Sequence, residues 1–205
     1  MKTRQVTIFS GHRFTVPQGV QRIDSQHTHG WQLRYAGTRL YSDHSSDGSG
    51  AAAALTAATK ELMVRIATNP APTRLQRRPN HSKSNNLPVG ISGPIVRQRA
   101  GSLARDCSLS VSVPRHGQTP QRRSVYIGTE NTYTQKKFKE ALARAVEIRQ
   151  EAETTYEREV TEAKRRDARK IATMLKSAPV RKGPAPKKVA VKKSAVKKTR
   201  TVTKR

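Results

Sequence analysis

The chain has 205 residues, and 41 lysines and arginines against 14 aspartates and glutamates give it a formal net charge of +27. Hydrophobic residues make up 34% of the chain and aromatic residues 4%, which is too little for one large core and enough for two modest ones. The charge favours nucleic acid as the partner, because a basic surface gains free energy by releasing the counterions of phosphates.

The cysteine count and the hydropathy pattern restrict the cellular setting. The single cysteine, Cys107, excludes an internal disulfide framework and a cysteine-based zinc site. No run of residues approaches the roughly 20 apolar residues of a membrane span, and residues 1–14 lack the apolar stretch of a secretory signal. The sequence therefore predicts a soluble protein of a reducing, cytoplasmic compartment.

One pattern occurs twice: a short strand led by glycine, two amphipathic strands forming a hairpin, and a helix. In the first copy the three strands and the alanine-rich helix are expected at 19–23, 30–36, 38–43 and 49–67. In the second copy the strands are expected at 90–96, 107–113 and 122–129, and a helix begins at Thr134. We therefore expect an α+β protein with two small modules, each a three-stranded antiparallel sheet packed on one helix.

Alternation within the first copy assigns its side chains to two faces. On the second strand Trp31 is expected to point inward and Arg34 outward. On the third strand Leu40 is expected to join the buried face, which places Arg39 and Tyr41 outward beside Arg34. Trp31 is therefore interpreted as a core residue and the three outward side chains as a binding face.

The second copy alternates valine and leucine with serine on its middle strand. The outward residues of its third strand are Arg122, Ser124 and Tyr126. A sheet with one face under a helix leaves the other face free, and a sheet of this width can enter the major groove of DNA.

The remaining segments are a linker, a helix extension and a tail. The second helix is expected to continue to about Leu175, and residues 147–162 carry six of the 14 acidic residues, as in a solvated helix with mixed charges. Small and apolar side chains from Phe138 to Ala163 form a loose near-heptad seam, so a homodimer through this helix is one hypothesis. The expected divisions are an amino-terminal segment, the first module, a linker, the second module, the helix extension and a disordered basic tail, at 1–18, 19–68, 69–89, 90–152, 153–175 and 176–205.

The strands and helices of both copies resemble the Apetala-type DNA-binding domain of plant ethylene-response factors, and its bacterial and phage versions more closely. The resemblance is carried by GVQRI, by GWQLRYAGTRLYSD, and by SVYIGT followed by a helix containing EALARAVEIRQ. The tail is similar in composition to the Lys/Ala/Pro tails of linker histones and bacterial histone-like proteins. The resemblance implies a three-stranded sheet in the major groove of DNA and a nucleoid-associated protein of bacterial or phage origin.

Carried over by position, the resemblance assigns DNA contacts to outward arginine, serine and tyrosine side chains. In the first copy these are Arg22, Arg34, Arg39 and Tyr41, and in the second they are Arg122, Ser124 and Tyr126. Arg97, Arg99, Arg115, Arg122 and Arg123 are expected to supply phosphate contacts in the second copy. The serine-faced middle strand lacks bidentate arginines, so we expect the first copy to read bases and the second to clamp the backbone.

No arrangement of residues indicates catalysis, a cofactor or a metal. The sequence holds no Gly-rich phosphate loop and no Ser/His/Asp arrangement, and His27, His29 and His44 have no cysteine and few acids near them. The leading hypothesis is a non-enzymatic double-stranded-DNA-binding protein with a role in transcription regulation or in the nucleoid. The alternatives are an RNA-binding or ribosome-associated structural protein and a DNA-packaging protein without sequence preference.

Overall fold

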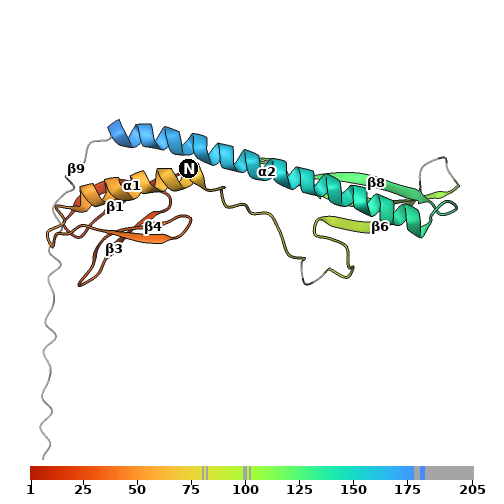
Figure 1. Cartoon of the computed structure of the whole chain (residues 1–205), viewed down its shortest axis with the longest axis horizontal. Helices are drawn as coiled ribbons and strands as arrows, with labels where there is room; N and C mark the ends of the chain where they lie inside the picture. Colours follow the sequence, from red (N-terminus) through yellow and green to blue (C-terminus); the bar gives the residue numbers. More distant parts are fainter. Residues whose placement is uncertain (80, 82, 99–100, 102, 178–180, 183–205) are drawn as a thin grey trace, which may run out of the picture.

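The computed structural model describes residues 1–79, 81, 83–98, 101, 103–177 and 181–182, and its fold is α+β, as expected. The first module contains strands β3 (Val20–Asp24), β4 (His29–Arg34) and β5 (Thr38–Ser42) and helix α1 (Ala51–Thr68). The second contains β6 (Ile91–Gln98), β7 (Arg105–Val113), β8 (Gln121–Thr129) and α2 (Gln135–Ser177). Each module is an antiparallel sheet in sequential strand order with a helix on one face (Figure 1).

A third small sheet lies next to the first module, in a part of the chain where the sequence analysis placed only an amino-terminal segment. It pairs β1 (Thr3–Thr7) with β2 (His12–Pro17), and β2 with the two-residue strand β9 (Arg181–Lys182). The ring of Phe14 meets that of Trp31 edge to face, with centroids 5.7 Å apart. The hairpin thus completes the core of the first module.

Of the tail expected at 176–205, residues 178–180 and 183–205 lie outside the described residues.

The core of the first module forms between β4 and the small-residue face of α1. Trp31 and Leu33 are fully buried, and the indole Nε1 of Trp31 donates a hydrogen bond of 2.8 Å to the carbonyl oxygen of Ala51. Alanines at 51, 54 and 58 let the first turns of α1 approach the sheet closely, and Leu62 and Ile66 continue the buried stripe. The prediction that Trp31 is a core residue is confirmed.

Both modules begin at a glycine that has the same local geometry. Gly19 has φ +104° and Gly90 has φ +80°, a region that side chains disfavour. The backbone N–H of Arg34 donates to the carbonyl of Gly19 at 2.7 Å, and that of Ser112 donates to the carbonyl of Gly90 at 2.8 Å. The end of the middle strand is therefore bonded in the same way to the glycine that precedes the first strand in both modules, as expected of an internal repeat.

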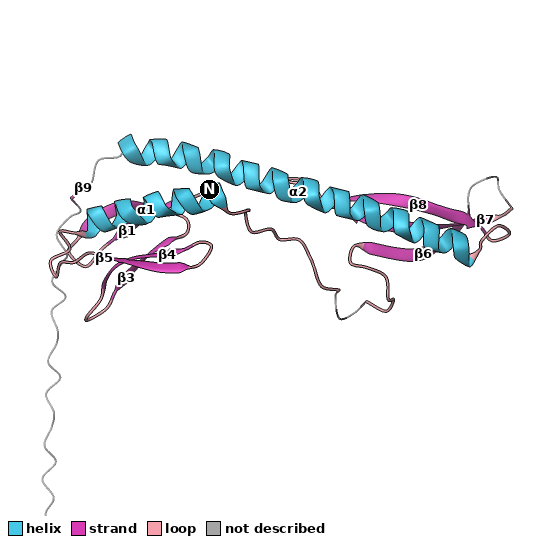
Figure 2. Cartoon of the chain, viewed as in Figure 1, coloured by secondary structure: helices cyan, strands magenta, loops and turns pink. Residues whose placement is uncertain are grey.

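Helix α2 joins the two modules. Its amino-terminal half covers the sheet β6–β8, where Ala141 and Ala145 are buried. Its carboxyl-terminal half packs along α1, where Ala168 belongs to the core of the first module and the Nε of Arg165 donates to the carbonyl of Ile66 at 3.4 Å. Figure 2 shows α1 lying along one end of α2 and the sheet of the second module lying along its other end. Residues 147–162, expected to form a solvated helix with mixed charges, are mostly exposed or half-buried, whereas the burial of Ala168 and Ile171 beyond them was not predicted.

The linker between the modules is held by side-chain hydrogen bonds. The backbone N–H of Ala71 donates to the Oγ1 of Thr161 at 3.1 Å, and Arg77 forms an ion pair with Glu157 of α2. The ammonium of Lys83 donates to the carbonyls of Leu87 and Pro88 at 2.6 Å each. Two of the basic side chains of this segment thus have partners within the chain.

No helix among the described residues is long and apolar enough to cross a membrane.

Candidate nucleic-acid interface

The face of each sheet that its helix does not cover, called here the open face, is where a long anionic partner could lie. Residues directly opposite one another in an antiparallel pair project to the same side of the sheet. In the first module Tyr41 lies opposite Trp31, and Arg39 opposite Leu33. Tyr41 and Arg39 are therefore on the helix side, and the expectation that they belong to the open face is wrong. Leu40, 44% exposed, occupies the open face in their place.

The turn between β4 and β5 explains this difference. Three residues, Tyr35 to Gly37, separate the paired positions Arg34 and Thr38, with φ +49° at Ala36 and +104° at Gly37. A shift of one residue in register exchanges the two faces of a strand. The turn selects the register that packs Tyr41 partly against the core and leaves the more apolar Leu40 outside. Arg39 remains exposed, with its guanidinium 5.3 Å from the Tyr41 ring.

Arg22 also lies on the helix side, opposite Trp31, where it forms a buried ion pair. Its two terminal nitrogens bond the two carboxylate oxygens of Asp43 at 2.9 and 2.6 Å, and its side chain is 6% exposed. Desolvation disfavours the charged forms, but hydrogen bonds with Asp43 and Asp24 outweigh it and raise the pKa of Arg22. The placement of Arg22 on a DNA-contacting face is corrected, because this guanidinium already has its partners inside the module.

The open face of the first sheet presents amides and one guanidinium instead. Its members, by register with Gln32 and Arg34, are Gln21, Ile23, Gly30, Gln32, Arg34, Thr38, Leu40 and Ser42. The Nε of Arg34 donates to the Oε1 of Gln32 at 2.6 Å, and none of these residues is acidic. Glutamine and arginine are the side chains that form bidentate hydrogen bonds with adenine and guanine. The predicted outward placement of Arg34 is confirmed.

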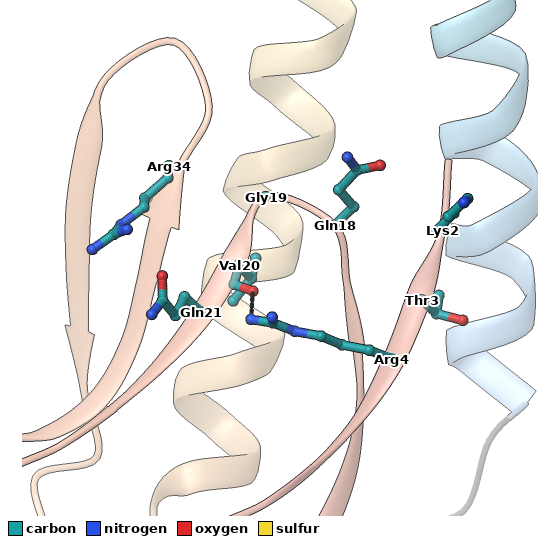
Figure 3. Close-up of a pocket in the computed structure, with 8 residues that line it drawn as sticks. All are labelled: Lys2, Thr3, Arg4, Gln18, Gly19, Val20, Gln21 and Arg34. Atoms are coloured by element: carbon teal, nitrogen blue, oxygen red, sulfur yellow. Dashed lines mark hydrogen bonds between the residues drawn. The ribbon is translucent and has the colours of Figure 1, made fainter.

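A basic groove borders this face where β1 runs beside β3 (Figure 3). Its volume is about 530 Å³, and Lys2, Arg4 and Arg34 supply the charge of its lining. The side chain of Arg4 reaches across the groove and donates from Nη2 to the carbonyl of Val20 at 3.3 Å. Lys2 and Arg4 were not predicted from the sequence, although alternating apolar residues on both sides of Ser10-Gly11 were a signal for a hairpin, namely Val6 and Ile8 before it and Phe14 and Val16 after it.

The open face of the second sheet follows the predicted pattern. Tyr126 lies opposite Ser108, Ser124 opposite Ser110, and Arg122 opposite Ser112. Their neighbours Val125 and Ile127 are buried, whereas Tyr126 is 55% exposed. The predicted outward placement of Arg122, Ser124 and Tyr126 is thus confirmed. The resulting surface is a row of hydroxyl groups with a tyrosine at one end and an arginine at the other.

The other arginines expected near the second sheet are dispersed around it. Arg97 is on the open face opposite Asp106, while Arg123 lies opposite Val111 on the helix side and is exposed. Arg115 is in the turn after β7, where it donates to the side-chain oxygen of Gln121 at 2.6 Å. Arg99 lies outside the described residues.

His29, at the start of β4, has local partners. The Nδ1 of His29 lies 3.0 Å from the Oδ1 of Asp24, and its ring centroid lies 4.2 Å from that of Phe9. Within the described part of the chain, no three histidine, cysteine or carboxylate side chains are arranged to hold a metal ion.

Comparison with family models, with curated proteins and with solved structures found no match to this chain.

Proposed function

We propose that this chain is a non-enzymatic DNA-binding protein, which presents the open faces of its two sheets to the major groove and adds non-specific affinity through its basic tail. The observation that carries the proposal is the pair of helix-backed sheets whose open faces hold polar and basic side chains, in a chain of net charge +27. A basic surface of this kind gains affinity for phosphates by counterion release, and exposed amide and guanidinium groups read base edges.

The two open faces support different roles. Gln21, Gln32 and Arg34 on the first sheet are side chains that discriminate between bases. The second sheet offers serine hydroxyls, Tyr126 and Arg122, which suit contacts with phosphates and sugars. The proposed division into a base reader and a backbone clamp is thus retained, but the base reader uses glutamines and Arg34 instead of Arg22, Arg39 and Tyr41.

Two exposed arginines on opposite sides of one sheet provide a matched test. Arg34→Ala removes a guanidinium from the open face, and Arg39→Ala removes one from the helix side. We expect Arg34→Ala to weaken binding to a preferred duplex, obtained by selection from a random library, by about 1–3 kcal/mol. Arg39→Ala should have a much smaller effect. Fluorescence anisotropy at fixed salt measures both, and equal losses would contradict this use of the open face.

A tyrosine pair provides the same test in the second module. Tyr126 is 55% exposed on the open face, and Tyr133 is 40% exposed beyond the end of β8. Tyr126→Ala should weaken duplex binding, and Tyr133→Ala should not.

Competition with structured RNA in the same assay separates the two nucleic acids, and a preference for RNA would replace the proposal with the ribosome-associated alternative.

A further inference from the structure

Helix α2 holds the two modules at different heights and on different sides of its axis. Ala145 is buried against the second sheet, and Ala168 is buried in the core of the first module. They are 23 residues apart in the sequence. This separation corresponds to a rise of about 35 Å and about 6.4 helical turns, so the two contact points lie about 140° apart around the axis.

Several side chains fix the first module on that side of α2. Thr161 accepts a hydrogen bond from the backbone of Ala71, and Arg165 donates to the carbonyl of Ile66. The ammonium of Lys164 lies 5.7 Å from the centre of the Tyr35 ring. These three residues share the side of the helix on which Ala168 lies, so the angular offset between the modules is built into the packing of α2.

Both open faces point away from α2. The second sheet has α2 on its inner face, so its open face is directed outward from that side of the helix. In the first module α1 lies between α2 and the sheet β3–β5 (Figure 1), so that open face is directed outward from the other contact side. A spacing of about 35 Å equals one turn of B-DNA and suits two reading heads on one side of a duplex. The offset of about 140° prevents a straight duplex from lying against both faces.

We infer that one copy of this chain bridges two segments of duplex DNA, with one segment on each open face. This inference rests on the proposed DNA binding. Charge on both faces suits such an occupant: the open face of the first sheet has no acidic member, and among the described residues of the second the single one, Asp106, lies opposite Arg97. The chain thereby acts as a cross-link between duplexes and not as a two-headed reader of one site.

A capture experiment tests the bridge. A biotinylated duplex is immobilised, the full chain is added and the excess removed, and a second, fluorescently labelled duplex is supplied. We expect the wild-type chain to retain the labelled duplex. Arg34→Glu and Arg122→Glu each reverse one exposed charge on one open face. Each variant should still bind one duplex and should capture the second about tenfold less.

Three controls assign the bridge to the two faces of a single chain. Both variants keep the whole tail, so second-duplex capture that persists at the wild-type level in both would assign the cross-link to the tail and overturn the inference. An equal mixture of the two variants should not restore capture, whereas restoration would assign bridging to a dimer. A duplex carrying a dye at each end should show no increase in energy transfer when the chain binds, because an increase would indicate one duplex wrapped around both faces.

Failure of the inference is distinguishable from failure of the proposed function. If the chain binds the immobilised duplex but never retains the labelled one, the bridge is wrong and DNA binding stands. If neither duplex is bound, the proposed function itself is wrong.

Discussion

At the scale of single residues, the ion pair of Arg22 with Asp43 joins β3 to the residue that follows β5. The Asp43 carboxylate has no exposed surface, and the guanidinium that neutralises it also lies 5.0 Å from the centre of the Trp31 ring. Removing one partner of a buried pair leaves the other charge without compensation. Arg22 is therefore a structural residue, whereas the sequence had led us to expect a DNA contact there.

The first prediction concerns this pair. Arg22→Ala should lower the free energy of unfolding of the first module by about 3–5 kcal/mol. Arg39→Ala, two strands away and exposed, should change it by less than about 1 kcal/mol. Urea denaturation followed by the fluorescence of the chain's single tryptophan, the buried Trp31, reports on this module. Similar midpoints for the two variants would show that Arg22 is not buried as described.

The second prediction concerns acid stability. Desolvation opposes ionisation of Asp24, but hydrogen bonds from Arg22 and His29 outweigh it and lower the pKa of its carboxyl group. A lowered folded pKa contributes stability that is present above the unfolded value of about 3.9 and is lost as pH falls through the folded value. Thermal unfolding of wild-type protein and Asp24→Asn should therefore differ above about pH 4 and converge below it. A difference that stays constant from pH 6 to pH 2 would contradict this assignment.

At the scale of secondary-structure elements, each helix is fastened to its sheet by one arginine near the end of the covering segment. The Nη1 of Arg65 in α1 donates to the carbonyls of Tyr35 and Gly37, at 3.1 and 3.0 Å, in the turn that sets the β5 register. Arg149 in α2 donates to the carbonyl of Ser112 at the corresponding end of β7, and to Glu153 at 2.6 Å. The repeated unit thus includes hydrogen bonds from a helix arginine to the sheet, which the sequence pattern did not reveal.

The third prediction tests the packing of Arg149 on the second sheet by substituting the glycine that lies next to it. A Cβ at Gly90 would lie 2.9 Å from the guanidinium carbon of Arg149, whereas a Cβ at Gly117 meets nothing within 4 Å, although φ is positive at both positions. Gly117→Ala should cost about 1 kcal/mol in backbone strain alone. Gly90→Ala should cost clearly more in chemical denaturation, because Arg149 must also move. Equal losses would mean that the contact with Arg149 is unimportant.

Structural features that depend on neighbouring residues could be predicted from the sequence, whereas those that depend on a turn geometry or on distant contacts could not. Strict alternation of valine or leucine with serine predicted both faces of β7, and Tyr126 was placed outward because the buried Val125 and Ile127 flank it. In β5 a leucine and a tyrosine compete for the core, and the turn at Ala36 and Gly37, not hydrophobicity, decides between them. The packing of α2 on α1 depends on contacts between residues about 100 positions apart, which periodicity does not encode.

At the scale of the whole molecule, charge is divided between folded faces and the carboxyl-terminal segment. Residues 183–205 carry nine lysines and arginines and no acid. Such a composition attracts phosphates without regard to sequence, whereas base-edge contacts are directional. Under the proposed function, we therefore expect affinity and selectivity to reside in different parts of the chain.

The fourth prediction separates these parts. Removing residues 183–205 should weaken binding to all duplexes alike and reduce the slope of log K against log salt by up to about 8. The ratio of affinities for preferred and scrambled duplexes should remain unchanged. Titrations at several salt concentrations, with Arg34→Ala as the variant that alters the ratio instead, measure both quantities. An unchanged slope would remove the segment from the binding mechanism.

The burial of Ala168 in the first module also has a consequence for biosynthesis. That core combines residues from β2, β4 and α1 with a side chain that leaves the ribosome more than 90 residues after α1 ends. Contacts so distant in sequence form late, and surfaces that await them are exposed during synthesis. The module that is translated first is thus completed only after the second sheet and most of α2 have been translated.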